Sequence, residues 1–240
     1  MNARRKLALI GMGKMGRVIE QLASERGWEV VARIGADTNR DGAGVTRALL
    51  KSADVAIEFT TPKAAGANIR AAVAARCPIV VGTTGWFGEL PALSEWVAQR
   101  GGALLTAANF SLGVNAFEQI VAVASRLLSS VAGFDAHLVE THHAAKKDAP
   151  SGTAITLRAA AARTWPREIP ITSIRIGSVP GTHELVFDAP FETVTLAHVA
   201  RDRRVFAEGA LVAAAWLIGR TGVFTMRDVL DGGHSRAGET

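Results

Sequence analysis

Residues 6–16 read K-L-A-L-I-G-M-G-K-M-G, an apolar run that leads into the pattern G-x-G-x-x-G. Lys6–Ile10 predicts a β-strand, and Lys14–Arg26 predicts the helix that follows it. In this context Gly11 permits a tight turn, Gly13 lets the backbone approach a pyrophosphate, and Gly16 allows close helix–strand packing. The stretch predicts a dinucleotide-binding fold; the alternative is a tight turn without a ligand. The predicted cofactor contacts here are Gly11, Met12, Gly13, Lys14 and Met15.

Short β-branched runs alternate with alanine-rich helical patterns over the first 110 residues. This alternation, with strands that are apolar throughout, is typical of a parallel sheet covered by helices on both faces. The predicted strands are Lys6–Ile10, Glu29–Ile34, Val55–Phe59, Ile79–Val81 and Ala103–Leu105. The predicted helices are Lys14–Arg26, Ala64–Ala75 and Leu90–Arg100.

Two polar loops follow predicted strands of this sheet, one at residues 82–85 (G-T-T-G) and one at residues 107–111 (A-A-N-F-S). Ligands of open α/β sheets bind outside the carboxyl ends of the strands, so both loops are expected to flank the nicotinamide. The alternative is a pair of capped polar turns. The predicted contacts are Gly82, Thr83, Thr84, Ala107, Ala108, Asn109 and Phe110.

The end of the second strand bears on the choice between NADH and NADPH. An acid at this point binds the ribose hydroxyls of NAD and disfavours a 2′-phosphate. Gly35 occupies the expected acidic position, while Arg33 and Lys14 are suited to a phosphate. Asp37 is an alternative ribose ligand after a small loop shift. We expect use of both cofactors, with a modest preference for NADPH.

The pattern changes after Asn109 and predicts a second, α+β domain. Its expected helices are Val114–Leu128 and Thr153–Arg163, and its expected strands are Asp135–Val139, Ile174–Ile176, Leu185–Phe187 and Thr193–His198. Gly- and Pro-containing turns between these strands favour an open antiparallel or mixed sheet. Helix Glu208–Gly219 then returns the chain to the first domain. We therefore predict a dinucleotide-binding domain at 1–110 and 207–240, and a second domain at 111–206.

Composition excludes several classes of protein. With 48% apolar and 20% charged residues, the 240-residue chain has the balance of a soluble globular protein, and no run approaches the length of a membrane span. The net charge of +5 is distributed along the chain, which favours small anions over nucleic acid. A single cysteine, Cys77, excludes an internal disulfide and a cysteine-ligated structural zinc site, and fits a reducing cytoplasm.

The most unusual stretch of the second domain is Glu140–Ala154, which reads E-T-H-H-A-A-K-K-D-A-P-S-G-T-A. His142, His143 and Lys146 are proton donors. Residues 151–153, Ser-Gly-Thr, stand where a helix begins, and a helix N-terminus is a natural anion site. The combination predicts a pocket for a small acidic molecule that is protonated during the reaction. His183 and His198 lack such a context and are read as loop or sheet residues.

Together these features resemble the dihydrodipicolinate reductase family, the 4-hydroxy-tetrahydrodipicolinate reductases of the diaminopimelate route to lysine. The resemblance covers nearly the whole chain, and its most specific part is the Glu140–Ala154 stretch. It implies an NAD(P)H-dependent reductase, with a Rossmann-type first domain and a second domain that binds substrate and builds a homotetramer. The implied substrate is a small cyclic imine with two carboxylates; no metal, nucleic acid or membrane is implied.

Residue roles follow from the same resemblance. His142 matches the catalytic histidine of the family and Lys146 its proton donor. His143 matches a histidine that contacts the substrate, and Ser151, Gly152 and Thr153 match the segment that holds a substrate carboxylate. A substrate arginine is matched by Arg203, with Arg204 beside it as the alternative.

Three departures from the family concern cofactor preference rather than the reaction. The glycine loop is one residue shorter than the spacing of many members, no acid ends the second strand, and Glu58 stands where many members have Asp. Two rival functions remain: another Rossmann oxidoreductase, such as an aspartate-semialdehyde or amino-acid dehydrogenase, and an NAD(P)-sensing module. Aspartate-semialdehyde dehydrogenase requires a nucleophilic cysteine in the second domain, and this chain has only Cys77 in the first. An NAD(P)-sensing module would need no proton donors.

Overall fold

The computed structural model describes residues 4–232, which divide into two units. The first unit comprises the described residues up to Ser111 and from Arg204 onward, and the second comprises Leu112–Arg203. These limits lie within three residues of the predicted ones. The functions assigned to the two domains stay predictions.

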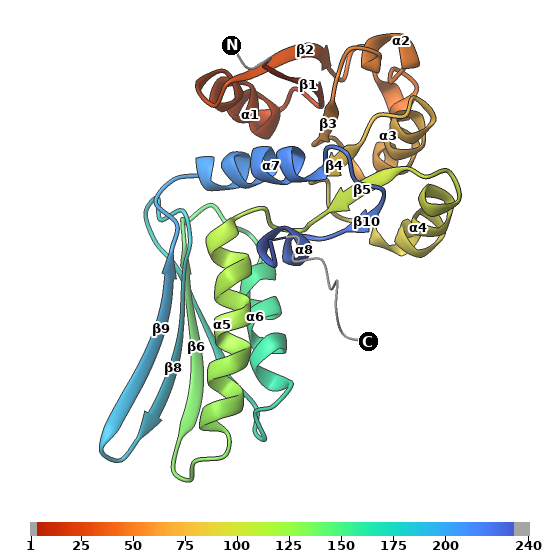
Figure 1. Cartoon of the computed structure of the whole chain (residues 1–240). Coiled ribbons are helices and arrows are strands. Elements are labelled where there is room, and N and C mark those ends of the chain that lie inside the picture. Colours follow the sequence, from red (N-terminus) through yellow and green to blue (C-terminus); the bar gives the residue numbers. More distant parts are fainter. Residues whose placement is uncertain (1–3, 233–240) are drawn as a thin grey trace. The chain divides into compact units, whose positions relative to one another are not determined.

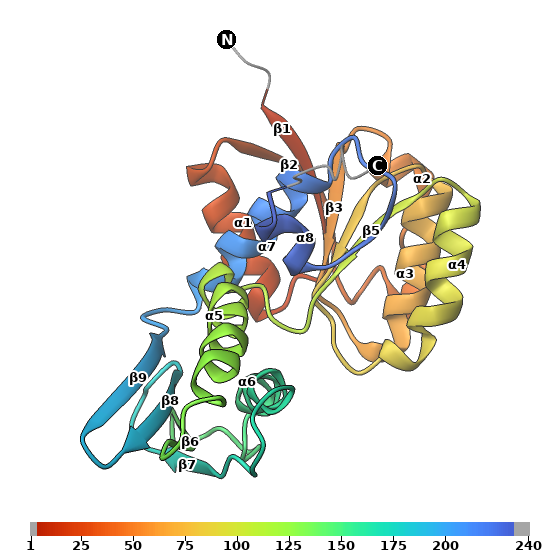
Figure 2. The same ribbon diagram turned by 60° about the horizontal axis from the view of Figure 1, so that its bottom comes forward.

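The first unit is a six-stranded parallel sheet with helices on both faces (Figures 1 and 2). The strand order is β10-β5-β4-β3-β1-β2, so the order reverses beside β1. The strands are β1 (Arg5–Ile10), β2 (Trp28–Ile34), β3 (Val55–Glu58), β4 (Ile79–Val81), β5 (Ala103–Thr106) and β10 (Gly222–Phe224). Strands β3, β4 and β5 are buried throughout, which is why they are apolar except for the last residues of β3 and β5, Glu58 and Thr106.

Two pairs of helices cover this sheet (Figure 2). One face carries α1 and α7, which pack against each other, and the other carries α3 and α4. The helices of the unit are α1 (Lys14–Glu25), α2 (Arg47–Leu50), α3 (Pro62–Ala74), α4 (Leu90–Gln99), α7 (Arg204–Leu217) and α8 (Met226–Leu230). The predicted Rossmann-type architecture is confirmed; α2, α8 and β10 are short elements that the sequence pattern did not reveal.

The second unit is a mixed four-stranded sheet with the order β7-β6-β8-β9. β6 pairs parallel with β7 and antiparallel with β8, and β8 pairs antiparallel with β9. The strands are β6 (Asp135–His142), β7 (Ile171–Arg175), β8 (Thr182–Ala189) and β9 (Glu192–Val199). Helices α5 (Leu112–Leu128) and α6 (Gly152–Ala162) pack on one face (Figure 1). The predicted α+β domain with a mixed sheet is confirmed.

Burial alternates along β6, where Ala136, Leu138, Glu140 and His142 are buried and their neighbours are not. Ala136 and Leu138 belong to an apolar core that also includes α5, α6 and β8. The same face therefore continues from apolar residues into a carboxylate and an imidazole. The predicted strand ends at Val139, but β6 runs to His142, because Glu140 and His142 continue its alternation of buried and less buried residues.

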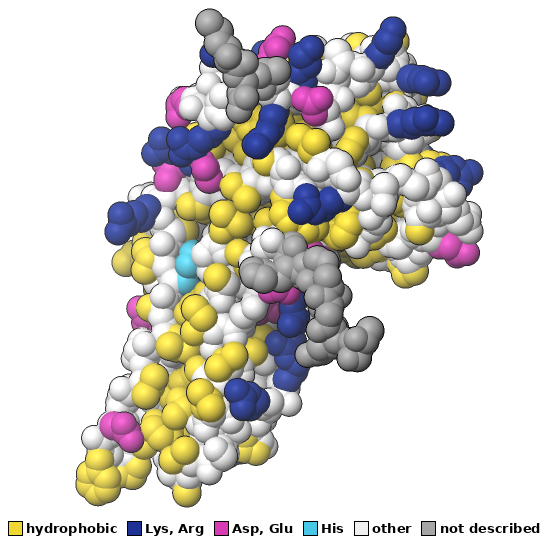
Figure 3. Space-filling view, in the orientation of Figure 1, with side chains coloured by type: hydrophobic (Ala, Val, Ile, Leu, Met, Phe, Trp, Pro, Cys, Tyr) yellow, Lys and Arg dark blue, Asp and Glu magenta, His cyan; other side chains and the backbone are white. Residues whose placement is uncertain are grey.

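Charged side chains do not form one basic stripe on the face that Figure 3 shows; Lys and Arg are spread over it, with acids between them. Among residues 4–232, no helix has both the length and the apolar character needed to span a membrane.

Candidate active site

The glycine loop has the close backbone contacts that its glycines are expected to serve. Gly11 has φ +99°, and a Cβ there would lie 1.9 Å from the Phe59 carbonyl oxygen. A Cβ at Gly16 would lie 2.0 Å from the Gly11 carbonyl oxygen. A Cβ at Gly13, by contrast, would meet nothing within 4 Å. Gly13 is the N-cap of α1, whose first turn contains no acid. This open, positively polarised helix end fits a pyrophosphate.

The two polar loops lie at the same edge of the sheet, because they follow the parallel strands β4 and β5. Thr84 and Ala108 are exposed there, whereas Thr83 and Phe110 are buried and tie the loops to the sheet. The Thr83 hydroxyl accepts a hydrogen bond of 2.7 Å from the Thr60 backbone N–H. The Phe110 ring packs against the Phe59 ring, with 5.8 Å between the two ring centroids. The exposed residues are suited to contact a cofactor, and the buried ones support them.

The end of β2 presents an open glycine. A Cβ at Gly35 would meet nothing within 4 Å, and both Asp37 and Lys14 are exposed. Arg33 forms an ion pair with Glu20. The candidates for binding the adenosine ribose of the cofactor therefore remain Arg33, Gly35 and Asp37. Of these, Arg33 already forms an ion pair with the Glu20 carboxylate.

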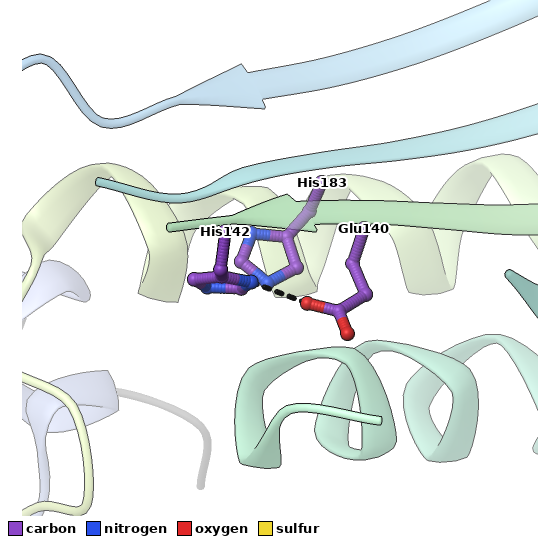
Figure 4. A group of neighbouring side chains, drawn as sticks. All are labelled: Glu140, His142 and His183. Carbon is purple, nitrogen blue, oxygen red and sulfur yellow. Dashed lines mark ion pairs between the residues drawn. The ribbon is translucent and has the colours of Figure 1, made fainter. Parts of the chain in front are cut away.

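A cluster of four ionisable side chains forms where β6, β7 and β8 run side by side. The sheet register places Glu140 on β6 opposite His183 on β8, and His142 opposite Arg175 on β7. Glu140, His142 and His183 are buried. Their side chains converge on the side of the sheet where α6 lies (Figure 4). We call Glu140, His142, Arg175 and His183 the sheet cluster.

Glu140 is the anionic centre of the sheet cluster. It is fully buried, and its Oε1 accepts a hydrogen bond of 2.7 Å from Arg175. The same oxygen accepts a bond of 3.3 Å from the Ser151 backbone N–H, and Oε2 contacts His142 Nδ1. Burial by itself raises the pKa of Glu140, but the hydrogen bonds from Arg175 and Ser173 and the charges of His142 and Arg175 lower it to about 2. Glu140 is therefore a carboxylate at neutral pH.

His142 has one ring nitrogen directed inward and one directed toward a glycine. Nδ1 is buried against Glu140, while Nε2 lies 3.0 Å from the position that a Cβ on Gly181 would occupy. Burial lowers the pKa of His142, Glu140 opposes this effect, and Lys146 and Arg175 lower the pKa further. The lowered pKa favours the neutral imidazole, and the contact with Glu140 fixes the orientation of the ring.

The other predicted substrate residues surround the sheet cluster. Lys146 lies in the turn after β6 and pairs with both oxygens of Asp148, at 2.8 and 2.9 Å. The Asp148 carbonyl in turn accepts a hydrogen bond of 2.6 Å from Arg175. His143, next to His142, is half-buried. This turn is therefore attached to the cluster through Arg175.

The N-terminus of α6 meets the cluster through Ser151, which is the N-cap. Its Oγ accepts a hydrogen bond of 3.2 Å from the Ala154 backbone N–H and lies 3.3 Å from His183 Nε2. Gly152 is exposed, and a Cβ there would meet nothing within 4 Å. Thr153 is half-buried. The first turn of α6 thus leaves space for an anion next to the proton donors.

No hydrogen bond or ion pair within residues 4–232 links Arg203 to the sheet cluster. Arg203 is exposed after β9, and Arg204 is the first residue of α7. Which of them contacts the substrate stays a prediction.

The site residues predicted from the sequence do not include Arg175, Glu140 or His183; His183 is predicted only as a loop or sheet residue, and it lies in β8. The available signal for Glu140 was its spacing of two from His142, which puts both side chains on one face of a strand. No such signal existed for Arg175 and His183. They reach the site only because of the strand register, which pairs His142 with Arg175, 33 positions apart, and Glu140 with His183, 43 positions apart.

Glu140, His142 and His183 are also close enough to ligate a divalent cation, with one candidate ligand atom from each within 4.8 Å of the others. Arg175 already supplies a positive charge to Glu140 at 2.7 Å, and a second cation would be repelled by it. The geometry therefore favours proton chemistry over metal chemistry. The expected absence of a metal stays a prediction.

Substitution Gly181→Ala is expected to lower kcat by about 10- to 100-fold, because its Cβ would press on His142 Nε2 and displace the ring. Gly177→Ala is the matched control: its φ of +52° also disfavours alanine, but its Cβ would meet nothing within 4 Å. Both variants are expected to lose thermal stability, and only the first to lose activity. Equal kcat values for the two variants would contradict this assignment of the ring nitrogen.

Acidification is expected to destabilise the protein through His183. Burial is the largest cause that lowers the pKa of His183, from 6.5 to about 4. As the pH falls, His183 is protonated in the unfolded chain at a higher pH than in the folded protein. The contribution of the neutral His183 to the free energy of unfolding is therefore complete above pH 6.5 and is lost as the pH falls toward 4. The loss is on the order of 3 kcal/mol.

Thermal unfolding measured at several pH values between 7 and 4 tests this expectation. Over that interval, His183→Gln should lose less stability than the wild type. His137→Gln, on the opposite face of β6, is the control and should keep the wild-type slope. Parallel curves for His183→Gln and the wild type would refute the assignment.

Comparisons with known proteins give a consistent result. The family model for the N-terminal domain of dihydrodipicolinate reductase matches residues 5–110, and that for the C-terminal domain matches residues 113–230. A 4-hydroxy-tetrahydrodipicolinate reductase of Christiangramia forsetii is 35% identical over 93% of this chain and 97% of its own length. Its counterpart in Zymomonas mobilis is 40% identical over 94% of this chain and 96% of its own length.

Among solved structures, dipicolinate-bound dihydrodipicolinate reductase from Paenisporosarcina sp. TG-14 has a TM-score of 0.77. It is 20% identical, and the match covers 93% of this chain and 98% of that one. This likeness concerns the fold.

Proposed function

Since the chain belongs to the dihydrodipicolinate reductase family, we propose that it catalyses the NAD(P)H-dependent reduction of 4-hydroxy-tetrahydrodipicolinate or dihydrodipicolinate. The product is tetrahydrodipicolinate, in the diaminopimelate route to lysine. The single observation that supports this most strongly is the contact of His142 with a carboxylate held ionised by Arg175, beside the N-terminus of α6.

Bound reduced nicotinamide supplies a hydride to the substrate ring, and the protein supplies the proton and the orientation. His142 and Lys146 are the proposed proton donors. A dianionic substrate raises the pKa of a neighbouring imidazole, so His142 takes up a proton as the substrate binds and donates it as the ring accepts the hydride. Glu140 stabilises the imidazolium through Nδ1 and keeps Nε2 directed toward Gly181.

The two substrate carboxylates require two separate partners. We assign one of them to the α6 N-terminus, where Gly152 and Thr153 offer backbone N–H groups and Ser151 and Thr153 offer hydroxyls, and we assign His143 to the same substrate. The other is assigned to Arg203, whose guanidinium is suited to a bidentate contact. Arg204 remains the alternative.

The first unit is the proposed dinucleotide-binding domain, with the contacts predicted from its three loops. The open space at Gly13 supports pyrophosphate binding there. Gly35 leaves the ribose position without an acid, which supports use of NADPH, while the Glu20 partner of Arg33 weakens one of the two cations suited to a 2′-phosphate. Use of both cofactors with a modest preference for NADPH therefore remains the proposal.

The second unit is the proposed substrate-binding and tetramerisation domain. Helices α5 and α6 cover only one face of its sheet. The opposite face carries many small, β-branched and apolar side chains, including Ile174, Ala197 and Val199, together with the polar His137 and Glu184. Ile174 is 41% exposed and Val199 is 59% exposed. Such a face supports association of this unit with copies of itself, which a molar mass from light scattering would test.

The experiment that tests the function is substrate-dependent loss of reduced-nicotinamide absorbance with freshly generated dihydrodipicolinate. Parallel assays with NADPH and NADH give the preference from the ratio of kcat/KM. We expect turnover with both cofactors. Binding of both without turnover would reject the reductase proposal and favour the NAD(P)-sensing module. A reducing cytoplasm, suggested by the single cysteine, is the proposed location.

A further inference from the structure

A second buried carboxylate lies in the first unit, away from the sheet cluster. Glu58 is the last residue of β3 and is fully buried. Its Oε1 accepts a hydrogen bond of 3.1 Å from Asn68 Nδ2 and a short one from the Thr60 hydroxyl. The Thr83 hydroxyl lowers the pKa of this carboxyl group, whose Oε2 has no hydrogen-bond partner within residues 4–232. No cation within residues 4–232 pairs with Glu58, and burying an acid without such a partner is costly, which raises the question of what this acid contributes.

The hydrogen bonds around Glu58 extend to a segment after β2. Asn68, on α3, accepts a bond of 3.0 Å at Oδ1 from Asn39 Nδ2. The Asn39 Oδ1 in turn accepts a bond of 2.9 Å from the Gly44 backbone N–H. Asn68 and Asn39 are both buried. This chain of amides attaches the segment that follows Gly35, the proposed ribose position, to the end of β3.

The same network extends to the two other loops proposed to contact the cofactor. Thr83, in the loop after β4, accepts the Thr60 backbone N–H at 2.7 Å. Thr60 Cγ2 lies 3.0 Å from the position that a Cβ on Gly11 would occupy, so Thr60 borders the glycine loop. Glu58 thus stands where the glycine loop, the segment after β2 and the loop after β4 can all be held by one side chain.

We propose that Glu58 is a positioning residue for the cofactor, which acts through Thr60, Thr83, Asn68 and Asn39 to hold these three loops at the spacing that NAD(P)H requires. The inference rests on the proposed function, because it presupposes that these loops bind the nucleotide. Burial is the largest cause that raises the pKa of Glu58, which the hydrogen bonds from Thr60, Thr83 and Asn68 oppose. A neutral side chain that keeps the accepting oxygen should therefore serve in its place.

The test compares two substitutions of Glu58 by nucleotide fluorescence and by steady-state kinetics. Glu58→Ala is expected to raise the Kd and the KM of both NADPH and NADH by about tenfold or more, because the three loops lose their common acceptor. Its kcat at saturating cofactor and its KM for the dicarboxylate should stay within about twofold of the wild type. Glu58→Gln should restore the wild-type Kd to within about twofold, since its amide oxygen accepts the same bonds.

Cys77→Ala controls for a merely structural effect. Cys77 is buried in the same unit but precedes β4, at the opposite edge of the sheet. This variant should lose thermal stability and keep its nucleotide Kd. An unchanged Kd for folded Glu58→Ala would overturn the inference.

If Glu58→Ala does not fold, Asn39→Ala provides the test. Among the links to the three loops, this variant removes only the hydrogen bond by which Asn68 is connected to the segment after β2. Its Kd should rise, and an unchanged value overturns the inference. Failure of the wild type to bind either nucleotide would instead reject the proposed function itself.

Discussion

Replacing Lys146 with alanine is expected to lower kcat by about 10²- to 10⁴-fold, the range that a positioned proton donor contributes. The KM of the dicarboxylate substrate should change much less, because the ammonium group acts mainly in the transition state. Lys146 is placed for this role by the turn after β6, in which its backbone N–H donates to the His143 carbonyl at 3.0 Å, and by its pairing with Asp148. Steady-state kinetics at saturating cofactor measure both parameters.

The neighbouring lysine is a matched control. Lys147 has the same charge and an exposed side chain. Lys147→Ala therefore changes the net charge of the protein by the same amount as Lys146→Ala but leaves the site residues in place. It should retain kcat. An unchanged kcat for Lys146→Ala would remove the proton-donor role, and a rise in KM alone would make Lys146 a carboxylate ligand instead.

Replacing Arg175 with methionine is expected to lower the free energy of unfolding by about 3–5 kcal/mol at neutral pH, the cost of leaving a buried charge without its partner. Glu140 is fully buried, and Arg175 is its guanidinium partner at 2.7 Å. The substitution also frees the Asp148 carbonyl, so the turn that carries Lys146 loses an attachment. Denaturant unfolding measures the first effect, and kcat should fall as well.

Two further variants separate charge from packing. Arg167→Met removes an arginine whose ion pair with Asp135 is long, at 3.7 Å, and exposed, so it should cost about 1 kcal/mol or less through that pair. Adding Glu140→Gln to Arg175→Met removes the isolated charge and should recover part of the lost stability. If the double variant is no more stable than Arg175→Met, the loss did not arise from an uncompensated carboxylate.

The sequence predicted the fold well where a local pattern carried the information. The glycine loop and the apolar strands of the first unit indicated a parallel sheet, since both are set by neighbours along the chain. Strand β10 has only the three residues Gly222–Phe224, none of them buried, so its pattern is too short and too weak to read. The family membership of the chain is confirmed by matches over both halves.

The candidate site was predictable only where its residues are consecutive. His142, His143, Lys146 and the α6 N-terminus lie in one stretch and were named from it. Arg175 and His183 join the site through strand register, and no local property of residues 171–186 fixes which of them faces Glu140. The roles of all these residues stay predictions until the variants are measured.

Strand β10 has a consequence for the order in which the chain assembles during its synthesis. It adds an edge strand beside β5, with Gly222 opposite Ala103, and α7 packs against β3, β4 and β5. The residues that complete the first unit are therefore translated after the whole of Leu112–Arg203. That intervening segment is continuous in sequence, and its four-stranded sheet contains only its own strands. All the strands and helices of the second unit are therefore translated before the first unit is complete. The nascent first unit already has α1 on this face, but the part of the face over β3, β4 and β5 stays uncovered until α7 leaves the ribosome. In that interval chaperones and aggregation compete for the exposed apolar surface.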